Sequence, residues 1–508
     1  MGNRYLVLSD LHLCDVEEHA DGWKAYKREK YLFDRDVSAL VERFLETTPD
    51  DAEPVLVLNG DVFDFDLVTA VPVDPPWPVR HAERVNGLDP TAAKSVFKLQ
   101  HMLSFHGELV RTLAHFVGGG HRLVYVLGNH DREFHFPEVK TAFVSALRDA
   151  ALEEGLAFDE EAVRFEPWFH YVPGEIYVEH GNQYDHYTSF RYALWPVVKM
   201  HGESMLALPM GNLSNRHLIN RMGFFNPHAS DYILNVYRYV AHWFRHYVFS
   251  KRALAIPWLL GSFRVMTELL DLKRRLLVEP PEQSEEFEAV TQRSGLPRET
   301  VKALARLWRP PITQRFFGIV RELWIDRVVM LLLMIVIGVV LELVPIPLWI
   351  KLMVPLTVFP LVFFVYEEIV KGEDIFTIEH RLPECARAIG ELLPVRVVTF
   401  GHTHKPRVIP LDGGLSFVDT GTWAPIMRKL EDDRLVPGYR NYLVADFTTD
   451  EPKVELLCWG RGPTGSERRS SFPPRALETN PPSAPPEHGR APRSDDGDAE
   501  AFEPRKVG

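Results

Sequence analysis

Cysteine is scarce in this chain, which has only Cys14, Cys385 and Cys458 among its 508 residues. The three lie far apart and form no CxxC pair, which argues against a disulfide framework and against a cysteine-based zinc site. Unpaired thiols of this kind are typical of a reducing compartment. Cys14 falls near candidate metal ligands, and we interpret it as an ordinary loop residue.

An excess of positive charge is also missing: 57 Lys and Arg stand against 70 Asp and Glu, a formal net charge of -13 at pH 7. A protein that coats nucleic acid needs a basic surface, so the composition argues against that class. It does not exclude an anionic substrate, because bound metal ions can reverse the local field. The segment MGNRYLVLSD has no charged stretch followed by an apolar one, so we expect no secretory signal.

Short apolar runs alternate with helical patterns in the first half of the chain, and polar residues follow each run at once. Such runs are typical of strands buried on both faces, and their alternation with helices predicts a layered α/β domain. The strand pattern returns after residue 371. The runs are residues 5–8, 55–58, 123–127 and 176–178, then 395–400, 415–418, 442–444 and 454–457, with helical patterns at 37–45 and 95–116.

Five short polar motifs each come directly after a predicted strand. In an extended segment, residues i and i+2 point to one side, so Asp10 and His12 could reach one cation together. Strand ends of an open α/β sheet gather at one edge, where binding sites form, so we expect one common site there. The motifs are Asp10-Leu11-His12, Gly60-Asp61-Val62-Phe63-Asp64, Gly128-Asn129-His130-Asp131, His180-Gly181 and Gly401-His402-Thr403-His404.

The candidate ligands mix imidazole with carboxylate and amide oxygen, which suits Mn, Fe or Zn better than Ca or Mg alone. They are too many for one tetrahedral ion but suit two ions that share a bridging ligand, and Asp61 is the natural bridge. The predicted cofactor is therefore a pair of divalent metal ions, with Mn preferred and Fe or Zn as alternatives. The candidate ligands are Asp10, His12, Asp61, Asn129, His180, His402 and His404.

In their order and spacing, the motifs resemble those of the calcineurin-like metallophosphoesterase superfamily, over residues 4–186 and 394–459. The resemblance implies an αββα four-layer sandwich with two packed mixed β-sheets, and an enzyme that hydrolyses phosphoric esters. It also implies that one metal ion is held by Asp10, His12 and His404, the other by Asn129, His180 and His402, with Asp61 shared.

The resemblance implies a separate catalytic role for His130, which would contact the phosphate and donate a proton to the leaving group. Asp64 would orient His130 by hydrogen bonding. Asp131 could share that task or only cap its loop, the reading that we favour. The two metal ions would lower the pKa of a bound water and neutralise charge on the phosphoryl oxygens. The predicted reaction is hydrolysis of a phosphate ester or a pyrophosphate by the hydroxide so formed.

The substrate stays open, and a lipid or a nucleotide phosphate is compatible with the sequence. The SDLHL start and the single large insertion resemble bacterial enzymes that cleave the pyrophosphate of UDP-diacylglucosamine. Those enzymes usually carry GNRD where residues 128–131 read GNHD, and they usually lack a two-span membrane segment, so this substrate is a minority alternative. A further alternative is a non-catalytic membrane scaffold or binding protein that keeps the fold. No protein partner is predicted.

The most apolar stretch, residues 328–366, is long enough for two membrane spans of about 20 residues joined at Pro345-Ile346-Pro347. Because it lies between His180 and His402, both halves of the site must share one side of the membrane, which two spans allow and one does not. Basic residues flank the outer ends more than the turn, which predicts a membrane protein with its catalytic domain in the cytoplasm. Those outer residues are Arg321, Arg327 and Lys371, against Lys351 near the turn.

Charges and prolines interrupt the apolar stretch, so a buried helical hairpin in a soluble cap stays an alternative, as does a hairpin that lies in the bilayer without crossing it. Between Arg191 and Glu279, Lys and Arg outnumber Asp and Glu by 12 to 5, which fits either an interfacial belt over anionic lipid or a packed helical layer. The predicted division is catalytic domain 1–189 and 371–459, helical insertion 190–325, hairpin 326–370 and disordered tail 460–508.

Overall fold

The computed structural model describes residues 2–17, 23–24, 26–28, 33–221, 223, 255–370, 377–424, 427–429, 435–437, 440–449, 451–461 and 467–471. In this part of the chain, the strands form two large sheets and two small antiparallel pairs. The small pairs are β7 (Val197–Met200) with β8 (Glu203–Leu206), and β12 (Met427–Lys429) with β13 (Leu435–Pro437).

Both large sheets are mixed. In one sheet the neighbouring strands β1, β2, β3 and β4 are parallel, and in the other β6, β9 and β11 are parallel. All other neighbouring strands in the two sheets pair antiparallel. The seven-stranded sheet has the order β16 (Glu467–Ser471), β15 (Lys453–Arg461), β14 (Arg440–Asp446), β1 (Gly2–Leu8), β2 (Ala52–Asn59), β3 (Arg122–Val126) and β4 (Val163–Glu166). The five-stranded sheet has the order β10 (Arg407–Pro410), β11 (Ser416–Asp419), β9 (Val397–Phe400), β6 (Ile176–Glu179) and β5 (Phe169–Tyr171).

The two large sheets pack face to face. Successive side chains of a strand point to opposite faces, so β1 divides its residues between two layers. Leu6 and Leu8 are buried in an apolar cluster shared with the helices on the outer face. Tyr5 points the other way, and its hydroxyl donates a hydrogen bond of 2.5 Å to the Glu175 carboxylate beside β6. A second bridge runs from Asn59 Nδ2 to the Glu179 carbonyl oxygen, 3.1 Å away.

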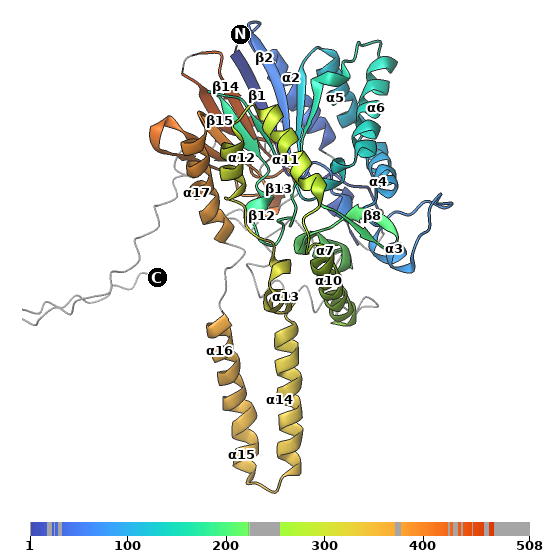
Figure 1. The fold of residues 1–508 in the computed structure, drawn as a ribbon, viewed down its shortest axis with the longest axis vertical. Helices are drawn as coiled ribbons and strands as arrows, with labels where there is room; N and C mark the ends of the chain where they lie inside the picture. Colours follow the sequence, from blue (N-terminus) through green and yellow to red (C-terminus); the bar gives the residue numbers. More distant parts are fainter. Residues whose placement is uncertain are drawn as a thin grey trace, which may run out of the picture. The chain divides into compact units, whose positions relative to one another are not determined.

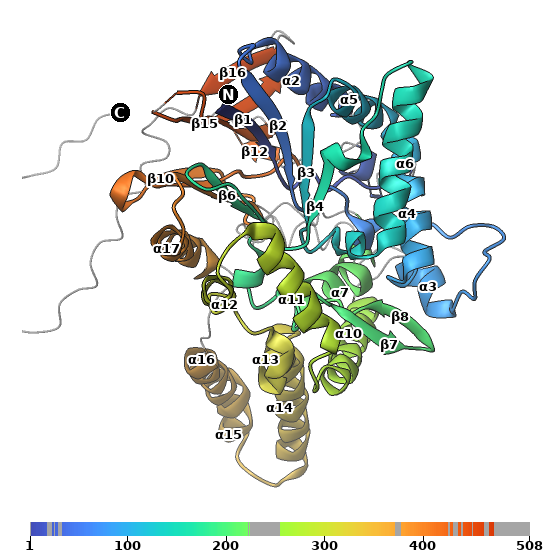
Figure 2. The same cartoon turned by 45° about the horizontal axis from the view of Figure 1, so that its top comes forward.

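Helices cover the outer face of each sheet, as Figures 1 and 2 show. The seven-stranded sheet is covered by α2 (Asp34–Glu46), α4 (Ala92–Phe105), α5 (Gly107–Gly118) and α6 (Pro137–Glu153), whose apolar residues share its core cluster. On the five-stranded sheet, α17 (Thr377–Leu392) and α12 (Arg298–Ala305) share a second cluster with β9 and β11. The helix–sheet–sheet–helix layering confirms the predicted α/β class with mixed sheets.

The helical pattern predicted over residues 95–116 is present but divided, because α4 ends at Phe105 and α5 begins at Gly107. The break falls at His106, whose side chain is fully buried. Its Nδ1 lies 2.9 Å from a carboxylate oxygen of Asp34, and its Nε2 lies 2.8 Å from the Cys14 carbonyl oxygen. These two contacts fix the imidazole between α2 and the segment after β1, which a continuous helix would not allow.

The insertion after residue 190 is not wholly helical, since it opens with the β7–β8 pair. Its described helices are α7 (Met210–His217), α10 (Ala255–Arg275), α11 (Pro281–Ser294), α12 and α13 (Phe316–Glu322). Helix α3 (His81–Asn86) is not part of the insertion and lies earlier in the chain. Residues 224–254 lie outside the described residues, and so do 462–466 and 472–508 of the predicted tail. The structure continues β15 to Arg461 and adds β16, so pairing extends past the predicted tail boundary at 460. The domain division otherwise stays a prediction.

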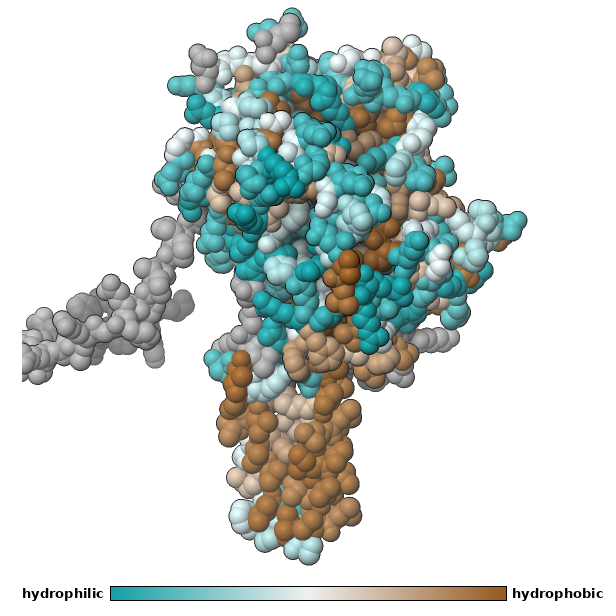
Figure 3. Space-filling view, in the orientation of Figure 1, coloured by the Kyte–Doolittle hydropathy of each residue, from teal (hydrophilic) through white to brown (hydrophobic). Residues whose placement is uncertain are grey.

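Residues 325–370 form a helical hairpin whose arms lie side by side (Figure 1). One arm is α14 (Ile325–Leu343), and the other consists of α15 (Leu348–Met353), a π-helical turn (Val354–Val358) and α16 (Phe359–Val370). No described side chain of α14 or α15 is buried, and Figure 3 shows apolar surface gathered over both arms. The described part of the chain therefore does not bury these two helices, which argues against a hairpin buried in a soluble cap. The helical segment Leu348–Ile369 is long and apolar enough to cross a membrane. Helices α13 and α14 are bent by 72° relative to each other, and they are long and apolar enough only if the two together are counted as one span.

We predict that Phe134→Ala destabilises the catalytic fold by about 3–5 kcal/mol, the usual cost of removing a buried aromatic ring. Phe134 is fully buried in the 3-10 turn Arg132–His135, just after the third motif, and its ring centroid lies 4.7 Å from that of Tyr125 and 5.5 Å from that of Phe143. Denaturant unfolding of the full chain measures the loss. Leu152→Ala on α6, where the side chain is 61% exposed, serves as control. Equal effects of the two changes would contradict the packing described.

Candidate metal centre

The segments after β1 and β2 continue side by side beyond the ends of the strands and present the first two motifs together. Asp10 N donates to Gly60 O at 3.1 Å and His12 N donates to Asp61 O at 2.8 Å. The fifth motif joins them from the other sheet, because His402 N donates to both carboxylate oxygens of Asp10 at 3.1 Å. Gly401 N donates to His180 O at 3.0 Å, which brings in the fourth motif. The predicted convergence at one edge of the sheets is therefore present.

The backbone turns sharply at these strand ends. Among the described residues other than glycine, eight have a positive φ, and five of those are candidate ligands. The left-handed conformation costs side-chain-bearing residues free energy, and it persists where the surrounding structure fixes it. The hydrogen bonds between motifs supply that constraint here. The five are Asp10 (φ 53°), His12 (φ 50°), Asp61 (φ 53°), His402 (φ 71°) and His404 (φ 60°).

The motif glycines are required because the motifs approach so closely. A Cβ atom on Gly60 would lie 2.5 Å from Nδ1 of His180, and one on Gly401 would lie 2.5 Å from a carboxylate oxygen of Asp10. A Cβ on Gly128 would collide with the side chain of Asp61. Any larger residue at these three positions would push a candidate ligand out of place.

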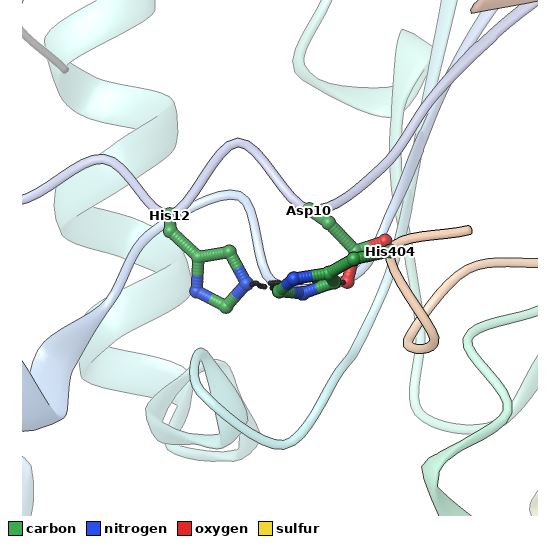
Figure 4. A group of neighbouring side chains, drawn as sticks. All are labelled: Asp10, His12 and His404. Carbon is green, nitrogen blue, oxygen red and sulfur yellow. Dashed lines mark hydrogen bonds and ion pairs between the residues drawn. The ribbon is translucent and has the colours of Figure 1, made fainter. Parts of the chain in front are cut away.

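Asp10, His12 and His404 form the first cluster, and Figure 4 shows the two imidazole rings turned toward one another. His12 Nε2 lies 3.1 Å from His404 Nε2, and His404 Nε2 lies 3.2 Å from Oδ1 of Asp10. Burial lowers the pKa of His12 to about 4, which keeps its imidazole neutral, the form that binds a metal ion.

Asp61, His180 and His402 form the second cluster. His180 Nε2 lies 3.1 Å from Oδ2 of Asp61, and the same Oδ2 lies 4.0 Å from His12 Nε2 in the first cluster. Asp61 therefore stands between the clusters, as expected of a shared ligand. Burial alone would raise the pKa of Asp61, but the positive charges of His180 and His130 outweigh it and hold that pKa well below its usual value.

Beside the second cluster, the buried Oδ1 of Asn129 lacks a hydrogen-bond partner. Nδ1 of His180 lies 3.0 Å from Asn59 O, which orients the ring with Nε2 toward Asp61. An unpartnered buried acceptor is costly, and a cation would supply a partner for the Asn129 oxygen. The residues present thus fit a metal centre with mixed nitrogen and oxygen ligands.

His130 is surrounded by carboxylates. Its Nδ1 lies 3.3 Å from Oδ1 of Asp64 and 3.3 Å from Oδ2 of Asp66. Burial alone would lower the pKa of His130, but the charges of Asp64 and Asp61 and the hydrogen bonds to Asp64 and Asp66 raise it well above its usual value. The second oxygen of Asp64 lies 3.2 Å from His12 Nδ1, so Asp64 contacts both histidines.

Asp131 caps its own loop, as the favoured reading of the sequence expects. Its oxygens accept hydrogen bonds from Gly128 N at 2.7 Å, Val62 N at 2.9 Å and the Tyr125 hydroxyl at 2.7 Å. These three donors join the second and third motifs to β3. No described contact links Asp131 to the imidazole of His130.

Sequence reasoning missed four residues that contact the motifs. Asp66 follows Asp64 at i+2, a spacing that could have drawn attention to it. Asp185 and Thr188 contact Nε2 of His402 at 3.2 and 3.1 Å, and no local pattern beyond their place shortly after the His180-Gly181 motif marks them. Asn212, on α7, contacts Asn129 and Asp66, and no local pattern marks it.

Comparison with known proteins agrees with this geometry. Residues 4–249 match the family model described as calcineurin-like phosphoesterase, a match that includes the first four motifs and α7. The comparison with curated proteins returned no match. The fifth motif lies beyond the matched residues, yet the structure brings His402 and His404 to the other four. The chain thus resembles the calcineurin-like phosphoesterases over residues 4–249, and the structure brings the fifth motif to the same sheet edge.

Proposed function

We propose that the chain is a membrane-attached phosphoesterase that uses two divalent metal ions, with Mn as the preferred metal. The observation that carries this proposal is the convergence of the candidate ligands from five strand ends, with Asn129 Oδ1 buried and unpartnered. Asp10, His12 and His404 would hold one ion, Asn129, His180 and His402 the other, and Asp61 would contact both. When bound, the ions would supply an activated water as the nucleophile and neutralise charge on the phosphoryl oxygens.

The proton donor in this proposal is His130. Asp64 and Asp66 lie at its Nδ1 and favour the charged imidazolium, the form that can donate a proton. Its other ring nitrogen would then deliver the proton to the departing oxygen, a step that contributes about 10²–10⁴ in rate. Phosphate monoesters, diesters and pyrophosphates of lipids or nucleotides all have such a leaving oxygen, and a UDP-diacylglucosamine-type pyrophosphate stays a minority candidate.

Membrane attachment is proposed from the exposed hairpin. Many apolar side chains of its arms are exposed, for example Leu333 at 58% and Leu361 at 62%. A contiguous exposed apolar surface of this kind is rare on water-soluble monomers and marks a site of interaction with a membrane or a protein. Polar contacts gather at the ends: Arg327 pairs with Glu367 at the base, at 2.7 Å, and Lys351 contacts Glu342 near the turn.

The chain enters and leaves the hairpin on one side. Strand β6 precedes the hairpin and β9 follows it, yet the two pair in parallel in one sheet. Two spans satisfy this constraint, and the excess of Arg and Lys at the base then favours a cytoplasmic catalytic domain. Helix α14 has 19 residues and is therefore about 28 Å long, which is close to the thickness of about 30 Å of the hydrocarbon core of a bilayer.

The rival function is a membrane scaffold that keeps the fold without catalysis. His130 with its two carboxylates argues against it, because a protein that only binds has no use for a buried proton donor beside a metal centre. Metal binding does not separate the two functions, whereas turnover does.

We predict that the chain binds two Mn²⁺ ions and that Asp61→Ala weakens both sites, because Asp61 is the only proposed ligand common to them. Each site occupied at 100 times its dissociation constant would stabilise the fold by about 2.7 kcal/mol. Isothermal titration calorimetry gives the stoichiometry, and thermal unfolding with and without a chelator gives the stabilisation. Asp412→Ala, at a fully exposed carboxylate, is the control. A chain that binds no Mn²⁺ would contradict the metal centre.

We predict that His130→Ala lowers kcat on aryl phosphates or bis-aryl phosphates by about 10²–10⁴, because proton donation is lost while the metal ligands remain. The measurement is steady-state hydrolysis with Mn²⁺, alongside calorimetry that shows two ions still bound. His115→Ala, on the exposed face of α5, should behave as wild type. Absence of turnover by the metal-loaded wild type on both substrates would favour the scaffold.

We predict that the full chain stays with the membrane after an alkaline wash, and that Val336→Arg combined with Leu361→Arg releases it. Each arginine near the middle of a span costs about 2.5–3.5 kcal/mol of insertion free energy. Leu277→Arg is the matched control, because Leu277 is 72% exposed but lies outside the hairpin. Recovery of the wild-type chain in the soluble fraction without detergent would refute membrane attachment.

A further inference from the structure

Asn212 belongs to α7, in the insertion, and reaches the edge of the proposed metal centre. Its side chain is 1% exposed and contacts two segments of the catalytic domain. Nδ2 donates to Oδ2 of Asp66 at 2.5 Å and to the carbonyl oxygen of Asn129 at 2.9 Å. Oδ1 accepts a hydrogen bond of 3.3 Å from Nδ2 of Asn129.

These partners determine which way the Asn212 amide faces. A carboxylate and a backbone carbonyl can only accept hydrogen bonds, so the NH₂ group of Asn212 must face Asp66 and the Asn129 carbonyl. Its Oδ1 then necessarily faces the side chain of Asn129. An oxygen in that place favours the NH₂ group of Asn129 over its carbonyl oxygen.

The orientation of Asn129 follows from that of Asn212. With Nδ2 of Asn129 held by Asn212, its Oδ1 is the atom left for other partners, and Oδ1 is buried without a hydrogen bond. An amide flipped by 180° would present NH₂ hydrogens to the cation instead of an oxygen lone pair, and a metal ion would not be bound.

We propose that Asn212 is a positioning residue that sets the amide of Asn129 for metal binding; this inference rests on the proposed role of Asn129 as a ligand. The same Asn212 amide holds Asp66, which lies 3.3 Å from His130 Nδ1, so one side chain of the insertion supports both the metal ligand and the proton donor. Asn212 itself is not one of the proposed metal ligands.

The helix that carries Asn212 is firmly held. Arg216, one turn further along α7, donates to Gly87 O at 2.8 Å and Leu88 O at 3.1 Å and pairs with Asp89 at 3.2 Å. His217 lies 3.0 Å from a carboxylate oxygen of Glu268 on α10. Asn212 is thus presented by an element fixed at its far end, as accurate positioning of a ligand requires.

The test measures Mn²⁺ affinity at each of the two sites by calorimetry on the full detergent-solubilised chain. Asn212→Ala should weaken one site by about 10–100-fold, the usual effect of losing a group that orients a ligand, and leave the other within about twofold. Asn212→Leu keeps the side-chain volume, guards against a folding defect in the alanine variant, and should give the same selective loss.

Asn220→Ala is the matched control. Asn220 is similarly buried, at 5% exposure, and also bonds to Asp66, but through the backbone carbonyl oxygen at 2.7 Å, and no described contact joins it to Asn129. Its Mn²⁺ affinities should stay within about twofold of wild type at both sites.

Wild-type affinity at both sites in the Asn212 variants would overturn this inference and leave the proposed function intact. Equal weakening of both sites would also overturn it, because that pattern indicates a general loss of structure. Failure of the wild type to bind Mn²⁺ would instead refute the metal centre itself.

Discussion

The structure depends on the burial of several carboxylates at one sheet edge. Asp10 and Asp61 are 0% and 1% exposed, and Asp64 and Asp66 lie beside them at 0% and 2%. Buried charges of one sign are strongly unfavourable unless cations compensate them. In the described chain the nearest positive charges are the imidazoles of His130 and His180, whose pKa values are raised by these carboxylates, for His180 to about 9. Bound divalent ions would also compensate the negative charge of these carboxylates, with two positive charges on each ion.

This charge requirement explains features of the fold that packing alone would not select. Strand ends adopt left-handed backbone at Asp10, Asp61 and His402, and glycine stands wherever two motifs would otherwise collide. Each feature is locally unfavourable or restrictive. Together they bring the oxygen and nitrogen donors of five separate segments into one volume, which no single helix or strand could do.

The sequence predicts the parts of this arrangement that depend on local pattern. Alternating apolar runs indicate the strands, and the polar residue pairs directly after them indicate the ligands, because the carboxyl ends of parallel strands meet at one edge. Residues joined only by tertiary contact are not accessible in this way. Asn212 lies 83 positions from Asn129, and its helix carries no signal for the contact. The break at His106 was missed for a related reason, since its cause is a bond to Asp34, 72 positions away.

The insertion is more than an anchor for the catalytic domain. Its α7 holds the amide of Asn212 against the proposed metal ligand Asn129, and the far end of α7 is joined to α10 through His217 and Glu268. Helix α10 in turn contacts α13, and a sharp bend at Trp324 leads from α13 into the first arm of the hairpin. The element that would enter the membrane and the side chain that would orient a metal ligand therefore belong to one continuous series of packed helices. In the proposed function, attachment and catalysis would therefore share a structural support, which runs from the first arm of the hairpin through α13 and α10 to α7.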